Sequence, residues 1–272
     1  MSNLTLRVVT AGVAAPILVT LILIPVAWPM WLLVYVATAV GLYEWGTMTL
    51  GVRSLAERVL VILLGLAVAA SIYYGDATVR LLTLAGATIV GLTYFLCRYG
   101  ELGTVAARFG VTMAGVLYVG VLLTFLALLK RRPEGRYGEW VFLTLTLTWF
   151  GDTFAYFAGR ALGRRKLYPA ISPGKTIEGA LGGLLGSIVA VVIAKAWYLA
   201  GTLAWWDCLA LAIPAGALGQ VGDLCESMIK RACRVKDSGV IIPGHGGILD
   251  RIDALLFSTP IVYAYAAVRF GL

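Results

Sequence analysis

Residues 203–222 read LAWWDCLALAIPAGALGQVG, and residues 223–253 read DLCESMIKRACRVKDSGVIIPGHGGILDRID. The first segment is apolar and about as long as the roughly 20 residues that a helix needs to cross a bilayer. The second segment holds five acids and five bases, and a further apolar run, 252–269, follows it. Ionisable groups at membrane depth are rare and usually functional, and the acids of this stretch directly adjoin apolar runs, so the stretch predicts a site at a membrane surface.

The composition of the whole chain has the same character. Hydrophobic residues make up 60% and charged residues 13%, with a mean hydropathy of +0.90. A soluble core could not cover so many apolar runs, so we expect a polytopic integral membrane protein. The formal net charge of +8 then reflects basic residues on the cytoplasmic side and anionic lipid headgroups, and we expect no nucleic-acid partner.

The fold class that the apolar runs predict is all-α, because an open strand cannot satisfy its backbone in lipid. About nine transmembrane helices are expected. They are placed at 9–27, 28–43, 58–74, 80–97, 109–129, 140–159, 178–200, 203–222 and 252–269. With a cytoplasmic N-terminus most basic residues fall on the cytoplasmic side, as the positive-inside rule requires. The basic cluster at 130–136 is the exception.

Two functional parts are expected. Residues 1–139 form N-terminal transmembrane helices that provide a scaffold and lipid access, and residues 140–272 form a C-terminal catalytic core. Within the core, the loop at 160–177 and the stretch at 223–253 fall on the same side, because two spans separate them. They can therefore build one site that faces the cytoplasm.

The start of the polar stretch predicts a continuing helix with one charged face. Asp223, Glu226, Ser227, Lys230 and Arg231 share an arc if the helix runs on past residue 222. A solvated helix end with pairs such as Glu226–Lys230 would explain the charges. It would not explain an acid so close to the apolar run, and this favours a functional reading.

A glycine-rich loop, Pro243–Gly247, follows. Its glycines leave backbone N–H groups open to an approaching anion, although a plain turn would also use them. Its His245 is the only histidine of the chain. Asp223 and Asp250 stand on either side of this loop, each at the end of an apolar run. Two carboxylates without a soft ligand nearby suit a hard cation such as Mg²⁺.

Two other segments carry polar groups. In Trp149–Tyr156, Asp152 and Tyr156 lie four residues apart and share a helix face, which a helix-packing hydrogen bond would also explain. In Ser172–Gly179, the sequence Gly-Lys-Thr resembles the end of a P-loop. The full pattern needs a glycine where Pro169 stands, and a preceding strand, so a P-loop is rejected. Lys175 remains as a phosphate-binding cation, with Ser172 or Thr176 as a helix cap.

The sequence S-M-I-K-R-x4-K-D-S-G-x3-P-G-H-G-G-I-L-D-R-I-D at 227–253 resembles the signature of the phosphatidate cytidylyltransferase (CDP-diacylglycerol synthase) family, without departure. The motifs W-F-G-D-T-x-A-Y at 149–156 and S-P-x-K-T-x-E-G at 172–179 resemble two others of that family. The resemblance covers about 145–258. It implies a homodimeric, Mg²⁺-dependent enzyme of the inner membrane that joins CTP to phosphatidic acid. The family's metal ligands map onto Asp223 and Asp250.

The expected roles follow from the meeting of two anions, where catalysis is mostly positioning and charge neutralisation. Asp223 and Asp250 bind Mg²⁺ and have room for a second cation. Further metal ligands or their neighbours are Glu226, Asp237, Asp253 and Asp152. The triphosphate is held by Lys230, Arg231, Lys236 and Arg251, with His245 orienting a phosphate. The phosphate path and the lipid headgroup are lined by Gly244, Gly246, Gly247, Lys175, Ser172, Thr176, Asp152, Tyr156, Arg164 and Arg165.

Two other functions compete with this one. A CTP-dependent kinase of polyprenol or phytol type would also use CTP and a metal, but would phosphorylate an alcohol. An ion-coupled transporter would suit the intramembrane Asp152 and the break near Pro214. The polar residues gather on one side of the membrane and not at its midplane, which favours the transferase.

Overall fold

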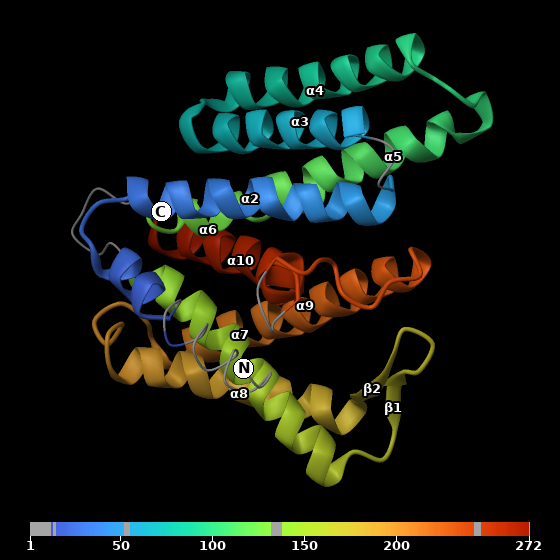
Figure 1. Ribbon diagram of the computed structural model, residues 1–272. Coiled ribbons are helices and arrows are strands. Elements are labelled where there is room, and N and C mark those ends of the chain that lie inside the picture. The colour runs from blue at the N-terminus through green and yellow to red at the C-terminus, as the bar shows by residue number, and fades with distance from the viewer. Residues whose placement is uncertain (1–11, 13–14, 52–54, 132–137, 242–245, 272) are drawn as a thin grey trace. The chain divides into compact units, whose positions relative to one another are not determined.

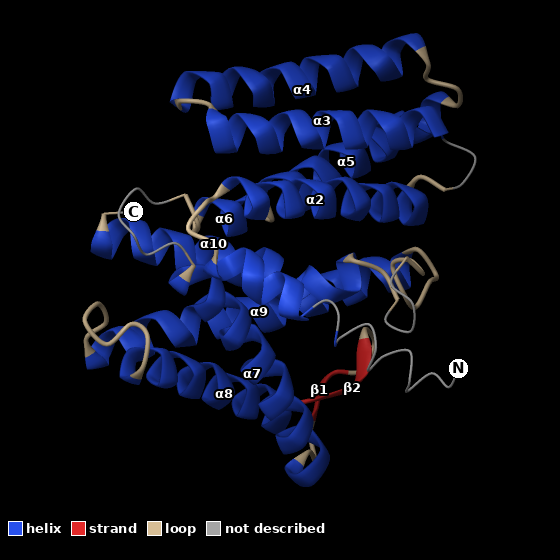
Figure 2. Cartoon of the chain, turned by 60° about the vertical axis from the view of Figure 1, so that its left-hand side comes forward, coloured by secondary structure: helices blue, strands red, loops and turns tan. Residues whose placement is uncertain are grey.

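The computed structural model describes residues 12, 15–51, 55–131, 138–241 and 246–271, and in these the chain is mostly helical (Figures 1 and 2). A first helical segment covers 15–23. The longer helices are α2 (Trp28–Thr49), α3 (Leu55–Tyr74), α4 (Ala77–Cys97), α7 (Glu139–Leu162), α8 (Ile177–Ala196), α9 (Trp205–Ala232) and α10 (Leu249–Phe270). The shorter ones are η1 (Leu102–Thr104), α5 (Val105–Gly115), the π-helical η2 (Val116–Val121) and α6 (Thr124–Leu128).

The prediction of a mostly helical chain with several helices that suit a membrane is confirmed. Five described segments are long and apolar enough to cross a bilayer: Leu55–Tyr74, Ala77–Cys97, Leu102–Leu128, Ile177–Ala196 and Trp205–Ala232. The continuation of the helix past residue 222 is also confirmed, because α9 runs to Ala232. The count of nine spans and the cytoplasmic N-terminus remain predictions.

The expectation of a wholly α-helical fold is corrected at one place. The segment expected as a loop at 160–177 contains two antiparallel strands, β1 (Lys166–Tyr168) and β2 (Ser172–Thr176). Figure 2 shows this hairpin in red, to one side of α7 and α8, which it connects along the chain. β2 ends at Thr176, where α8 begins. The hairpin therefore lies beyond the apolar parts of α7 and α8.

The chain forms two compact units. The first unit consists of residues 28–128 and 237–250 with the N-terminal 1–12, and the second of 13–27, 129–236 and 251–272. The functional division predicted near residue 139 remains a prediction.

In the first unit, aromatic side chains of α2 lock the helices together. Trp31 stacks on Tyr73 of α3 at 4.3 Å between ring centroids. Trp45 donates a hydrogen bond from Nε1 to the carbonyl of Val111 in α5, at 3.0 Å. A buried ion pair joins Glu57 to Arg108. These contacts hold α2, α3 and α5 in one bundle.

In the second unit, α7 and α8 pack closely because α8 presents glycines to the backbone of α7. A Cβ atom at Gly179 would lie 3.0 Å from the carbonyl oxygen of Ala155, and one at Gly183 would lie 3.2 Å from that of Gly151. Small residues at such a crossing let helices approach closely in a membrane. This close packing holds the ends of α7 and α8 together where the hairpin joins them.

Lys130 is the most deeply buried cation among the described residues of the second unit. Its side chain is 0% exposed, and Nζ donates to the carbonyls of Leu21, Ile22 and Ile24 at 2.7, 2.5 and 2.8 Å. These carbonyls lie at the end of the first helical segment, where no further helical N–H can serve them. Burial lowers the pKa of Lys130 to about 8, so the side chain still carries its charge at pH 7.

Lys130→Met should therefore destabilise the protein. Three buried carbonyls lose their donor, and the expected loss of unfolding free energy is about 3 kcal/mol or more. Thermal unfolding of the purified protein in detergent measures it. The control is Lys195→Met, which removes a lysine with a single carbonyl partner, Ala200. Equal unfolding temperatures for the two variants would contradict the capping role of Lys130.

Candidate functional site

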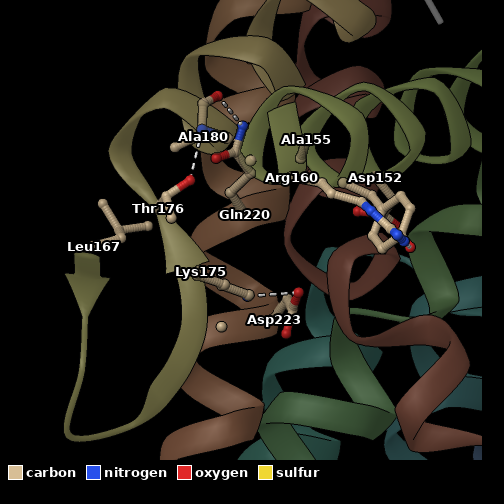
Figure 3. Close-up of a pocket in the computed structure, with 13 residues that line it drawn as sticks. Asp152, Ala155, Arg160, Leu167, Lys175, Thr176, Ala180, Gln220 and Asp223 are labelled. Atoms are coloured by element: carbon tan, nitrogen blue, oxygen red, sulfur yellow. Dashed lines mark hydrogen bonds and ion pairs between the residues drawn. The ribbon is translucent and has the colours of Figure 1, made fainter. Parts of the chain in front are cut away.

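A cavity of about 590 Å³ opens in the second unit where the hairpin meets the helices. Its walls come from α7, β1, β2, α8 and α9, so five elements between residues 139 and 232 share it (Figure 3). The polar lining residues are Asp152, Tyr156, Arg160, Lys175, Thr176, Gln220 and Asp223. All but Arg160 and Gln220 were predicted from the sequence as site residues.

The hairpin is tied to the helices at three points. Thr176 caps α8, because its side chain accepts a hydrogen bond from the N–H of Gly179 at 3.0 Å. Glu178 accepts hydrogen bonds from the backbone N–H groups of Arg164 and Arg165 at 3.1 and 3.3 Å. Arg231 of α9 donates from Nε to the carbonyl of Ile171, in the hairpin turn, at 3.4 Å. Lys175 is thereby held on a fixed strand and not on a loose loop.

Lys175 and Asp223 form an ion pair across the cavity. Their Nζ and Oδ2 atoms lie 2.6 Å apart, and the two side chains are 28% and 31% exposed (Figure 3). The sequence predicted a phosphate-binding role for the lysine and a metal-binding role for the carboxylate, but not their contact. The ammonium group of Lys175 thus occupies the place that a metal ion would take beside Asp223. The carboxylate of Asp223 occupies the place that a phosphate would take beside Lys175.

The acids predicted near Asp223 gather around it. Asp253 interacts electrostatically with Asp223, Glu226 and Asp152, and Asp152 does so with the cations Lys175 and Arg251. Among the described residues no group of three or more His, Cys, Asp or Glu side chains could by itself hold a metal ion. Carboxylates gathered in this way fit Mg²⁺, which usually takes one or two carboxylates and completes its shell with water and substrate phosphates.

Of the bases predicted to hold the triphosphate, Lys230 and Arg231 bind other groups of the protein. Lys230 is buried and pairs with Glu226 at 2.6 Å. Arg231 donates to the carbonyls of Ile171 and Val235. Lys236 and Arg251 are exposed, as are Arg164 and Arg165 before the hairpin. Tyr156 accepts a hydrogen bond from Arg160 at 2.9 Å in the cavity wall.

In the first unit, the signature stretch folds back on Asp250. Its Oδ2 atom accepts hydrogen bonds from the N–H and Oγ of Ser238 at 2.9 and 3.0 Å, and from the N–H of Gly247 at 2.9 Å. Gly246 has φ +83°, a conformation that favours glycine. The predicted Gly244 and His245 lie outside the described residues. Asp250 and Asp223 belong to different units, so their shared cation remains a prediction.

Sequence reasoning missed Glu44. This residue of α2 is 1% exposed and accepts hydrogen bonds from the N–H groups of Ile248 and Leu249. The signal was a single acid directly after the apolar run 28–43. Residues 1–139 were expected to provide a scaffold and lipid access, and this contact gives them a direct link to the signature stretch.

The sequence pattern of the cytidylyltransferase family matches residues 5–269. The chain belongs to this family. It is 37% identical over 178 residues to the phosphatidate cytidylyltransferase of Staphylococcus saprophyticus. The aligned region covers 64% of this chain and 66% of that protein. It is 41% identical over 156 residues to the phosphatidate cytidylyltransferase of Bacillus subtilis, with 56% of each chain covered. The family predicted from the signature is thereby confirmed.

Lys175→Met should impair the cytidylyltransferase activity of the family. The methionine fills the same space but leaves Asp223 without its cation and the cavity without a phosphate-binding charge. We expect kcat/KM to fall by at least about tenfold, which corresponds to roughly 1.4 kcal/mol. Lys166→Met is the matched control, because Lys166 lies exposed on the other strand of the hairpin. Equal losses in both variants would assign the effect to hairpin stability or surface charge.

Proposed function

We infer that the protein is a phosphatidate cytidylyltransferase, a nucleotidyltransferase of phospholipid biosynthesis. It transfers the cytidylyl group of CTP to phosphatidic acid and forms CDP-diacylglycerol and pyrophosphate. The family match and the names of the relatives support this activity. The observation that carries it is the cavity at the polar ends of α7, α8 and α9, where a lysine and a carboxylate already meet.

The reaction joins two anions. A phosphate oxygen of phosphatidic acid attacks the α-phosphorus of CTP, a new P–O bond forms, and the bond to the β-phosphate oxygen breaks. Pyrophosphate leaves with the electron pair of that bond. The attacking oxygen is already ionised near neutral pH, so a general base contributes little. The barrier is electrostatic, and fixed positive charges lower it most.

Lys175 supplies one of these charges. When a phosphate group enters the cavity, the ammonium group leaves Asp223 and binds the phosphate. Asp223, released from the lysine, would then be available to hold Mg²⁺. Mg²⁺, held by Asp223 and Asp250 with Glu226, Asp237 and Asp253 as further oxygen donors, would neutralise charge on the phosphates, and a second cation could share these acids.

The remaining residues position the two substrates. Arg164 and Arg165 lie exposed just before the hairpin, where they meet the headgroup of phosphatidic acid. Tyr156, Asp152 and Ser172 complete the substrate wall beside Lys175. Lys230, Arg231, Lys236 and Arg251 hold the triphosphate, with the backbone of Gly244, Gly246 and Gly247 along its path and His245 orienting a phosphate.

The membrane arrangement is part of the proposal. Nine transmembrane helices with a cytoplasmic N-terminus place this site at the cytoplasmic face of the inner membrane, in a homodimer. The exposed Trp205 and Trp206 stand at one end of α9 and Asp223 near the other, as expected for a helix anchored in the far interface. Residues 140–272 form the catalytic core, and residues 1–139 its scaffold.

Asp250→Asn tests the assignment directly. The purified variant, supplied with CTP, phosphatidic acid and Mg²⁺, should release pyrophosphate at least about 100-fold more slowly than the unchanged protein. Asp76→Asn is the control, because Asp76 caps α4 and asparagine caps a helix equally well. Wild-type turnover by a folded Asp250→Asn variant removes Asp250 from the mechanism. Labelled CTP identifies the reaction, since a lipid kinase would leave free CDP instead of CDP-diacylglycerol.

Removal of divalent cations should stop the reaction reversibly. A chelator takes away the charge that neutralises the phosphates, so turnover falls to background, and added Mg²⁺ restores it. Pyrophosphate release measures both steps in one sample. Undiminished turnover after chelation would mean that the gathered carboxylates serve another purpose.

A further inference from the structure

Glu44 binds the beginning of α10 from another helix. Its Oε1 accepts a hydrogen bond from the N–H of Ile248 at 3.0 Å, and its Oε2 accepts one from the N–H of Leu249 at 2.9 Å. The first N–H groups of a helix have no partner within the helix. A negative charge is also most favourable at this end of the helix dipole. The carboxylate of α2 therefore acts as the cap that α10 does not supply itself.

Asp250, the acid in the first turn of α10, binds a neighbouring backbone group. Asp250 accepts a hydrogen bond from the N–H of Gly247, three residues earlier and just before α10. Asp250 and Glu44 thus bind the three consecutive N–H groups of Gly247, Ile248 and Leu249, where the chain enters α10. The position of each carboxylate depends on the same short run of backbone.

Ser238 connects the two carboxylates. Its Oγ atom lies 3.2 Å from Oε2 of Glu44 and 3.0 Å from Oδ2 of Asp250. A hydroxyl has one hydrogen, so it donates to one of the two acids at a time. Its backbone N–H holds Asp250 throughout. A shift of Glu44 is therefore passed to Asp250 through one residue.

Two glycines of the signature are shaped around Glu44. A Cβ atom at Gly239 would lie 2.5 Å from Oε1 of Glu44, and one at Gly247 would lie 2.6 Å from Oε2. Any side chain at either position would push the carboxylate out of its place. Both positions need glycine because the Glu44 side chain of α2 lies so close to them. The sequence alone indicated only a loop with open backbone N–H groups.

We propose that Glu44 is a positioning residue, which fixes the signature backbone around Ser238 and Gly247 and thereby holds the carboxylate of Asp250 in the position from which it would bind Mg²⁺. The inference rests on the proposed function in so far as Asp250 takes part in the reaction. A carboxylate in a catalytic site must be held within a fraction of an ångström of its working position, and the groups that hold it matter almost as much as the carboxylate itself.

Glu44→Gln is the test, because glutamine keeps the size of the side chain but replaces one acceptor oxygen by an NH₂ group. That group faces the N–H of Ile248 or Leu249, so one hydrogen bond becomes a clash of donors. We expect kcat to fall by about 10- to 100-fold. We also expect amide hydrogen exchange at Ile248 and Leu249 to speed up at least about tenfold in the substrate-free protein.

Glu57→Gln is the matched control. Glu57 is a buried acid of the same unit, but its partner is Arg108 and it does not touch the signature stretch. This variant should lower the unfolding temperature and leave both kcat and the exchange at Ile248 and Leu249 within about twofold of the unchanged protein. A role of Glu44 in stability alone would make the two variants behave alike, and that result overturns the proposal.

The outcomes separate the inference from the proposed function. Asp250→Asn could be inactive while Glu44→Gln shows normal amide hydrogen exchange at Ile248 and Leu249 and a normal kcat. That result refutes only the positioning role of Glu44. If Asp250→Asn is fully active, the role of Asp250 falls and the positioning role falls with it. If Glu44→Gln does not fold, Ser238→Ala removes only the connecting hydroxyl and should lower kcat by at least about fivefold. A normal kcat in that variant refutes the path from Glu44 to Asp250.

Discussion

A charged group beside a membrane is stable only where fixed partners replace the water that it has lost. The buried charges described above meet that condition with different kinds of partner. Lys130 is enclosed by three carbonyls. Glu44 is enclosed by backbone N–H groups and a hydroxyl. Glu226 and Lys230 neutralise each other on successive turns of α9. The polar parts of the fold are arranged around these partnerships, and the apolar helices supply the frame.

The pair in the cavity differs from the others in one respect. Lys175 and Asp223 are each about one third exposed, so both can change partners when a ligand arrives. The buried pairs cannot exchange without leaving a charge unpaired, which is far more expensive. The protein thus combines charges that keep the backbone in place with a pair that can be opened by a phosphate. This difference in exposure separates the pair for which we propose a role in substrate binding from the buried charges that hold the backbone.

Much of this arrangement could be predicted from the sequence. The signature stretch identified the family, and the spacing of Asp223, Glu226 and Lys230 predicted the helix that carries them. Asp152 and Tyr156 were expected on one face, and both line the cavity. The hairpin was missed because Ser172–Thr176 contains Pro and Gly, which are rare in strands. The pairing of its two strands and its contacts with α8 and α9 hold it extended.

Glu44 and Lys130 were missed for a different reason. Local patterns show where a charge stands, but not which backbone groups it will meet. Glu44 pairs with residues 204 and 205 positions further on, and Lys130 with carbonyls more than a hundred positions earlier. Lys130 also belongs to the basic cluster that disagreed with the positive-inside rule. Its charge is used inside the fold, which sequence counts of loop charges do not consider.

These long separations also set the order in which the protein can be completed during translation. The end of the first helical segment keeps open carbonyls until the ribosome has added Lys130. The acid on α2 has no helix to cap until residues 248 and 249 emerge, when most of the chain is already in the bilayer. The signature stretch therefore takes its shape as one of the last events of biosynthesis, so a nascent chain released before residue 248 would carry Glu44 without the backbone N–H groups that it binds.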